Sequence, residues 1–403
     1  MLFVSKAGKN KAVLTLGWTL IVAGVAVGAY AYVIYPILVW MIAQFSEGNP
    51  VQGAAIEWPE VTVVLPVHNE DQVIAGTLDA ILAVDYPKDQ MHILVVSDAS
   101  TDRTDEIVDS YKSRGVRLIR MPLRAGKTAA ENEARHHVRG QIVVNTDASV
   151  RIASDALKPL VAAFRDPAVG VASGRDVSVA RGGDANVGEG GYVGYEMLVR
   201  AWETRAGGIV GASGCFFGSR VELHEQVVPS ALSRDFAAPL IAREHGYRSV
   251  SVQDAVCYVP RQGSLRREYR RKVRTMTRGL ETLFFKRTLL NPFRFGRFAW
   301  MLMSHKLIRW LVPWAAVAVL VGGGIVAFSL GLGAVYMITV GVASLLSCLA
   351  WFWPLRYRVP VAVSLPAYVV LGLVAGVHAW IKAALGELNP IWEPTKRDSI
   401  RVG

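Results

Sequence analysis

The stretch VTVVLPVHNE (residues 61–70), followed by HILVVSDASTDRT (residues 92–104), decides the fold of this chain. Each segment begins with apolar, largely β-branched residues and ends in polar ones, which predicts a buried parallel strand. Because ligands gather at the carboxyl ends of strands in an open α/β sheet, we expect the polar side chains there to converge on one crevice. These side chains are Asn69, Glu70, Asp98 and Asp102. Two ordinary capped strand ends are the alternative interpretation.

Two further acids flank predicted elements: one follows a strand and the other precedes a helix-like apolar run. A third strand is predicted at 141–145 (QIVVN), and Asp147 follows it. A carboxylate on a rigid strand end suits a divalent cation that also bridges phosphate oxygens. Asp235 precedes the apolar run 237–242. For both acids, simple capping of the helix that follows is the alternative.

Long uncharged stretches predict membrane spans on both sides of this polar region. The chain has 403 residues, of which 52% are hydrophobic. Residues 12–46 carry no charge and predict one span that stays as an anchor, while 310–355 suit two helices of about 20 residues and 359–381 suit one. The three cysteines have no metal-ligand spacing, which indicates neither zinc nor a disulfide framework.

The net charge of +11 is concentrated between residues 261 and 309, where 14 Lys and Arg face two Glu. Phenylalanines interleave with these cations just before an apolar stretch, which favours amphipathic helices on an anionic leaflet over nucleic-acid binding. The positive-inside rule then places the polar domain in the cytoplasm. Four spans leave both termini outside, whereas the basic residues near both ends favour inside, so residues 307–326 are alternatively re-entrant or interfacial.

Seven motifs occur in a fixed order: PVHNE, SDASTD, RAGKTAAEN, NTDAS, SGCFFGSR, SRDF and RRKVRTMTRG. This order, over residues 58–279, resembles membrane-bound family 2 glycosyltransferases with the GT-A fold, in particular bacterial exopolysaccharide and capsule synthases. The resemblance implies an α/β nucleotide-sugar-binding domain with transmembrane and interfacial helices. The expected parts are an N-terminal anchor (1–48), the cytoplasmic GT-A domain (58–260), basic interfacial helices (261–306), about three C-terminal spans (307–386) and a tail (387–403).

The resemblance also assigns residues to the nucleotide-sugar donor. Pro66, Val67, Asn69 and Glu70 match the loop that cradles the nucleoside, and Asp98 matches the acid that reads a uracil base. Lys127 matches a cation beside the diphosphate, and Gly214 lies in a segment near the sugar or acceptor. Arg271, Arg274 and Arg278 are expected to clasp the diphosphate from the membrane side. The alternatives are a solvated loop lysine for Lys127, a turn for Gly214 and a phospholipid-facing helix for the arginines.

The metal and the base follow from the same resemblance. Asp147 matches the first acid of a DxD metal motif whose second acid is Ser149 here, so Mg²⁺ or Mn²⁺ is expected to be held by Asp147, the diphosphate and water. Asp235 matches the base that takes the proton of the acceptor hydroxyl, which gives a single displacement with inversion. If the adjoining Arg234 pointed the same way, it would lower the pKa of Asp235.

The expected function is a cytoplasm-facing, inverting hexosyltransferase of the inner (plasma) membrane. It would transfer sugar from a nucleotide-sugar, expected to be a UDP-sugar, to a growing or lipid-linked glycan of a cell-surface polysaccharide, with possible export or assembly partners. The QxxRW motif of processive synthases reads Lys272 to Met276 here and lacks the tryptophan. This favours single-sugar transfer to a polyprenyl phosphate or lipid-linked oligosaccharide as an alternative, and a non-catalytic binding or export subunit is a further one. The tryptophan-containing tail 392–397 favours a cytoplasmic C-terminus.

Overall fold

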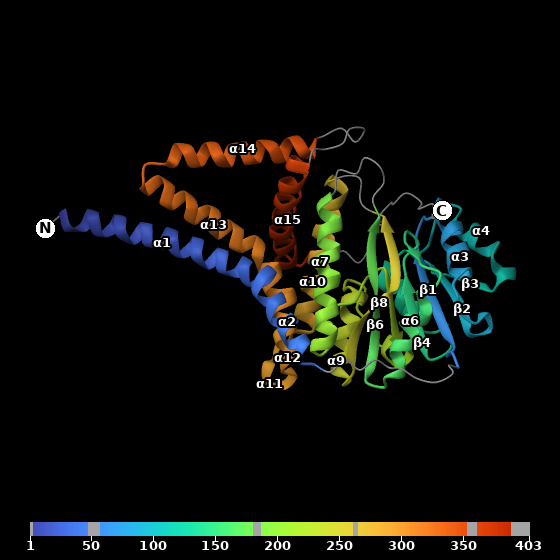
Figure 1. Cartoon of the computed structure of the whole chain (residues 1–403). Coiled ribbons are helices and arrows are strands. Elements are labelled where there is room, and N and C mark those ends of the chain that lie inside the picture. The colour runs from blue at the N-terminus through green and yellow to red at the C-terminus, as the bar shows by residue number, and fades with distance from the viewer. Residues whose placement is uncertain (1–2, 47–56, 180–186, 261–264, 353–360, 388–403) are drawn as a thin grey trace.

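The computed structural model describes residues 3–46, 57–179, 187–260, 265–352 and 361–387. An eight-stranded sheet with its covering helices forms one part, and long helices project from one side of it (Figure 1). Almost all of the predicted tail 387–403 lies outside the described residues.

The sheet has the strand order β3-β2-β1-β4-β7-β6-β8-β5. Strands β1 to β4 are mutually parallel where they pair, whereas β7 is antiparallel to both β4 and β6. The strands are β1 (Val61–Val67), β2 (Met91–Ser97), β3 (Val116–Arg120), β4 (Ile142–Thr146), β5 (Arg151–Ile152), β6 (Val169–Val179), β7 (Phe216–Arg220) and β8 (Arg248–Pro260). The three strands expected from the sequence are therefore present, and β1, β2 and β4 direct their carboxyl ends to the same edge.

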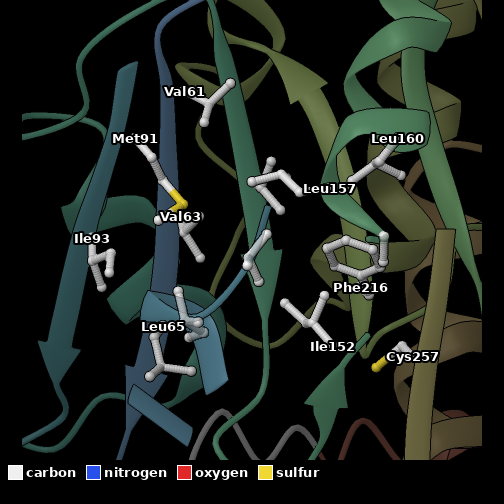
Figure 2. Packing of buried hydrophobic residues seen from close by; sticks show 14 of the residues in the cluster. Val61, Val63, Leu65, Met91, Ile93, Ile152, Leu157, Leu160, Phe216 and Cys257 are labelled. Atoms are coloured by element: carbon white, nitrogen blue, oxygen red, sulfur yellow. The ribbon is translucent and has the colours of Figure 1, made fainter. Parts of the chain in front are cut away.

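Every residue of β1 is buried, because helices cover both faces of the sheet. On one face Val63 and Leu65 pack in the large apolar cluster that also contains Phe216 of β7 (Figure 2). On the other face Val64 packs with Ala130. The helices of this domain are α3 (Ile74–Leu82), α4 (Thr104–Asp109), α5 (Lys127–Ala134), α6 (Leu157–Ala162), α7 (Val187–Ala206), α8 (Val221–His224) and α9 (Arg234–Glu244).

The other part of the chain consists of the basic helix α10 and of apolar helices that expose many of their side chains. The elements are α1 (Phe3–Ala29), the π-helical η1 (Tyr30–Ile34), α2 (Tyr35–Gln44), α10 (Leu265–Phe285), α11 (Pro292–Phe295), α12 (Arg297–Leu302), the π-helical η6 (Met303–Ile308), α13 (Arg309–Ser329), α14 (Gly333–Trp351) and α15 (Val361–Ala384). Among the described residues, three helical stretches are long and apolar enough to cross a membrane, namely Asn10–Gln44, Arg297–Ser329 and Pro366–Ala384. Gly333–Leu349 is a shorter apolar helix.

The stretch from Arg297 to Ser329 runs as one continuous helical segment. It includes Pro313 inside α13 and the glycines at 322–324.

Helices α1 and α13 pack with their backbones in contact. A Cβ atom on Gly24 would lie 2.5 Å from the carbonyl oxygen of Ala315, and one on Gly322 would lie 2.5 Å from that of Gly17. Small residues allow this close approach, which lets dispersion contacts hold two apolar helices together in lipid.

We predict that Gly24→Val separates α1 from α13 and destabilises the protein by about 1–3 kcal/mol, the usual effect of overpacking a close contact. Gly28→Val is the matched control, because a Cβ on Gly28 meets nothing within 4 Å. Thermal unfolding in detergent measures both variants. Equal melting temperatures for the two would show that the glycine contact does not hold the helices together.

Candidate active site at the carboxyl edge of the sheet

Asp98 fixes the loop that leads into α5. Its Oδ1 accepts the backbone N–H of Ala125 at 2.7 Å, its Oδ2 accepts that of Gly126 at 2.8 Å, and the residue is only 1% exposed. Gly126 stands at the start of α5 with φ +95°, a conformation that glycine adopts without strain. This pair of hydrogen bonds sets the position of Lys127, the first residue of α5.

The loops after β1 and β2 lie against each other. Asn69 and Ala99 both have left-handed backbones, with φ of +53° and +51°, and such conformations cluster at functional loops. The Asn69 Oδ1 accepts the Thr101 N–H at 2.7 Å, and the Glu70 N–H donates to Thr104 Oγ1 at 2.8 Å. Pro66 and Val67 are buried at the end of β1. The predicted nucleoside-cradling residues are thus brought together with Asp98 at one edge.

Lys127 occupies the centre of the site. Its Nζ donates to Asp147 Oδ1 at 2.5 Å and to the carbonyl oxygen of Gly214 at 3.1 Å. Burial acts to lower the pKa of Lys127, but the nearby carboxylates of Asp147, Glu131 and Asp235 outweigh it and raise that pKa above its usual value. Lys127 therefore stays cationic, and it is not a solvated loop lysine.

Asp235 lies next to Gly214, whose carbonyl oxygen accepts from Lys127. A Cβ on Gly214 would lie 2.7 Å from Asp235 Oδ2, so only glycine leaves room for the carboxylate. Ser233 Oγ donates to Asp235 Oδ1, and the Ala212 N–H donates to the Asp235 carbonyl oxygen at 3.2 Å. The structure therefore brings Lys127, Asp147, Gly214 and Asp235 into one constellation.

Arg234 points away from Asp235 and toward α8. The guanidinium is buried and donates to the carbonyl oxygens of His224 at 3.1 Å and Gln226 at 3.2 Å, and to Asn132 Oδ1. Arg234 therefore does not point the same way as Asp235, and its hydrogen bonds go to the other side of α9.

The three arginines of α10 have different positions. Arg278 Nη2 donates to Thr128 Oγ1 at 2.8 Å and to the Ser230 carbonyl oxygen at 3.1 Å, so it joins the start of α5 to the loop before α9. Arg271 makes two hydrogen bonds to the buried Glu268 of its own helix, at 2.8 and 2.9 Å. Arg274 is half-buried on the same helix. Of the three, Arg278 contacts the residue that follows Lys127.

The donor set at Asp147 fits a cation that arrives with the donor diphosphate. Among the described residues, no group of three or more His, Cys, Asp or Glu side chains could hold a metal ion. Mg²⁺ in proteins is commonly bound by one or two carboxylates together with substrate phosphates and water. One carboxylate at the end of β4, in contact with a lysine, matches that arrangement and not a preformed protein cage.

The sequence motifs missed Asp176 of β6. Its Oδ1 accepts the hydroxyl of Ser213 at 2.6 Å, directly before Gly214. The Ser213 Oγ also accepts the Cys215 N–H at 3.0 Å. Asp176 thus supports the turn that carries Gly214, but it belongs to no motif, so only the pairing of β6 with its neighbours could have revealed it.

Comparisons with known proteins agree with this geometry. A family model described as Glycosyl transferase family 2 matches residues 62–228. An N-acetylglucosaminyltransferase of Bradyrhizobium elkanii is 31% identical over 163 residues, 38% of this chain and 89% of the relative. A beta-monoglucosyldiacylglycerol synthase of Synechocystis is 30% identical over 122 residues, 29% of this chain and 26% of the relative. The first relatives are thus matched over about a quarter of their own length.

A solved structure shares the fold over nearly the whole chain. It is a mannosyltransferase from Pyrobaculum calidifontis in complex with GDP-Man and Mn²⁺, with a TM-score of 0.67 and 24% identity, covering 91% of this chain and 99% of that one. The fold is therefore the GT-A glycosyltransferase fold, as the sequence predicted. This chain belongs to glycosyl transferase family 2.

We predict that Gly214→Ala lowers turnover at least about tenfold, because its Cβ would displace the Asp235 carboxylate. Gly191→Ala is the control, since a Cβ there meets nothing within 4 Å. Steady-state rates and thermal unfolding of both variants separate a local effect from misfolding. Unchanged turnover in a folded Gly214→Ala protein would contradict the closeness of Gly214 to the reacting groups.

Proposed function

We propose that this glycosyltransferase is an inverting enzyme of the inner (plasma) membrane with its catalytic domain in the cytoplasm. It takes a sugar from a nucleotide-sugar, for which we propose a UDP-sugar, and adds it to a growing or lipid-linked glycan of a cell-surface polysaccharide. The observation that carries the proposal is the cationic Lys127 between Asp147 and the Gly214 carbonyl, with the Asp235 carboxylate beside Gly214.

The donor half of the proposal rests on charge. A diphosphate brings negative charge to the edge where Lys127 meets Asp147, and the lysine ammonium offsets that charge. We propose that Asp147 holds Mg²⁺ or Mn²⁺ together with the diphosphate, and that the cation supplies Lewis-acid stabilisation to the leaving group. The mannosyltransferase complex with GDP-Man and Mn²⁺ supports this proposal by likeness of fold. We propose that Asn69, Glu70 and Asp98 cradle the nucleoside.

The acceptor half rests on Asp235. Its carboxylate takes the proton from an acceptor hydroxyl while that oxygen attacks the anomeric carbon of the donor sugar. The bond from the anomeric carbon to the diphosphate oxygen breaks, and the nucleoside diphosphate leaves on the opposite face. One displacement of this kind inverts the anomeric configuration.

A specific contact favours the single-sugar alternative over a processive polymerase. Met276 stands at the position of the missing tryptophan, and its Cε is 3.2 Å from where a Cβ of Gly376 would lie, so it packs against α15. This position therefore presents no aromatic ring to an acceptor sugar. Sizing the product from purified enzyme decides between one added sugar and a polymer.

We predict that Asp235→Asn lowers kcat at least about a hundredfold, the usual contribution of a general base, and leaves donor binding unchanged. Asp155→Asn is the matched control, because Asp155 is exposed. Release of UDP from UDP-sugars by the purified protein measures the effect. If folded Asp235→Asn turns over normally, another group takes the proton.

We predict that a chelator removes turnover and that Mn²⁺ or Mg²⁺ restores it, because Asp147 alone supplies too few ligands to retain a metal without the diphosphate. Asp147→Asn should raise the metal concentration for half-maximal rate about tenfold or more, since it removes the one carboxylate ligand. Full activity in excess EDTA would show that Lys127 alone neutralises the diphosphate.

A further inference from the structure

A buried group of charged side chains joins the catalytic domain to the first two candidate spans. We call it the membrane-side ion cluster. It consists of Glu196, Arg200 and Glu203 of α7 together with His305, Lys306 and Arg309 of the span helix. Charged side chains inside candidate spans are costly and commonly mark a binding site or an ion path.

The carboxylates of the cluster are already engaged by its own members. His305 Nε2 pairs with Glu196 Oε1 at 2.9 Å and Nδ1 pairs with Glu203 Oε1 at 2.5 Å. Arg309 Nη1 pairs with Glu196 Oε2 at 2.6 Å, and the Tyr35 hydroxyl donates to Glu203. The partners of Glu196 hold the pKa of its carboxyl well below the usual value, although burial acts in the opposite direction.

The cluster has more positive than negative charge. Arg200, Lys306 and Arg309 are three cations against two carboxylates, before His305 is counted. Arg200 is 8% exposed and Arg309 is 6% exposed. Arg200 Nε forms an ion pair with Glu196 Oε1 at 3.5 Å, and the Arg309 guanidinium lies over the rings of Tyr32 and Tyr195. Three other buried guanidinium nitrogens, Nη1 of Arg200 and Nε and Nη2 of Arg309, have no hydrogen-bond partner in the described chain, against one carboxylate oxygen, Glu203 Oε2. Buried donors without an acceptor cost free energy, and an additional anion at this cluster would offset that cost.

Lys306 extends from this cluster toward the catalytic base. Its Nζ lies 5.5 Å from the centre of the Phe236 ring and 3.1 Å from where a Cβ of Gly211 would be. Phe236 follows Asp235 directly, and Ala212 N–H donates to the Asp235 backbone. Within the described residues no hydrogen bond or ion pair holds the Lys306 ammonium, which is half-buried. An anion at Lys306 would therefore lie beside the residue next to the base.

The helices at this level have an irregular winding. Both η1 of the first span and η6 of the second are π-helical, and they contact each other through the Tyr30 and Ser304 hydroxyls at 2.8 Å. Single π-helical turns occur mostly at functional sites, because the wider turn redirects side chains. Lys306 lies within η6, and its ammonium group contacts Phe236 of the catalytic domain.

We infer that the membrane-side ion cluster binds the phosphate of a lipid-linked acceptor. This inference rests on the proposed function and names the chemical class of its acceptor. The lipid chain lies along the candidate spans. The phosphate accepts from Lys306 and from the guanidinium N–H groups of Arg200 and Arg309 that have no hydrogen-bond partner in the described chain. The sugar on that phosphate presents its hydroxyl to Asp235. The hydroxyl proton goes to Asp235, its oxygen bonds to the anomeric carbon, and the nucleoside diphosphate leaves with the electron pair. The acceptor phosphate is not consumed.

Binding of farnesyl phosphate to the full-length protein in detergent micelles tests the inference by calorimetric titration. Lys306→Gln is expected to weaken binding about tenfold, the usual effect of losing one charge-assisted hydrogen bond, whereas Lys306→Arg retains it. The matched control is Arg287→Gln, an exposed cation of the basic segment, which should leave binding unchanged. Farnesol should bind equally weakly to all variants, and thermal unfolding confirms that each variant is folded.

Four results would each overturn the inference. Equal weakening by Arg287→Gln would indicate general attraction of anions to a basic surface. Equally tight binding of inorganic phosphate would show that the lipid is not recognised, and equal competition by phosphatidylglycerol vesicles would assign the site to bulk lipid. Weakening by Lys127→Gln but not by Lys306→Gln would place the phosphate in the donor crevice.

Sugar transfer in the same preparation separates this inference from the proposed function. If nucleotide-sugars turn over but Lys306→Gln binds farnesyl phosphate as tightly as the unchanged protein, only the inferred acceptor site is wrong. If no nucleotide-sugar turns over although Lys306 binds the lipid phosphate, the proposed function is wrong and the anion site stands.

Discussion

The carboxylate of Asp98 is the interaction on which the site geometry depends. By accepting the N–H groups of Ala125 and Gly126, it holds the end of β2 against the start of α5. Lys127 is the next residue, so the same two hydrogen bonds bring its ammonium to Asp147 on β4. A carboxylate oxygen accepts more than one hydrogen bond, so this structural role of Asp98 is compatible with the proposed contact to the nucleobase of the donor.

The charge around Lys127 explains why a metal would arrive with the donor. Lys127 interacts with three carboxylates, those of Asp147, Glu131 and Asp235, and burial raises the pKa of Glu131. A diphosphate entering this edge adds negative charge that one ammonium cannot balance. Asp147 would hold a divalent cation together with the diphosphate, and that cation would supply the missing charge.

The sequence predicted the strand ends because their pattern is local. An apolar run closed by polar residues marks where each strand ends, and the parallel pairing of β1 with β2 and β4 then places Asp98 and Asp147 at one sheet edge. The direction of Arg234 and the partner of Arg278 were not predictable, because a side chain chooses among neighbours that only the tertiary fold provides. The membrane-side ion cluster was even harder to predict, because Glu203 and His305 are about a hundred residues apart in the sequence. In sequence they belong to separate segments that share no motif.

The absence of a tryptophan from the QxxRW position does not mean that no tryptophan lies beside this part of α10. Beside Gly279 of α10 the structure has the indole of Trp310, which would lie 2.8 Å from a Cβ at that glycine and meets Phe236 edge to face at 5.7 Å. The span helix thus places an aromatic ring between Gly279 of α10 and Phe236, the residue after Asp235. Met276 packs against α15 instead. Trp310 follows Lys306 by four residues, so one face of the span carries both a cation and a ring to Phe236. The span helix thus packs against Phe236, the residue after Asp235, which ties this side of the proposed site to the packing of the apolar helices.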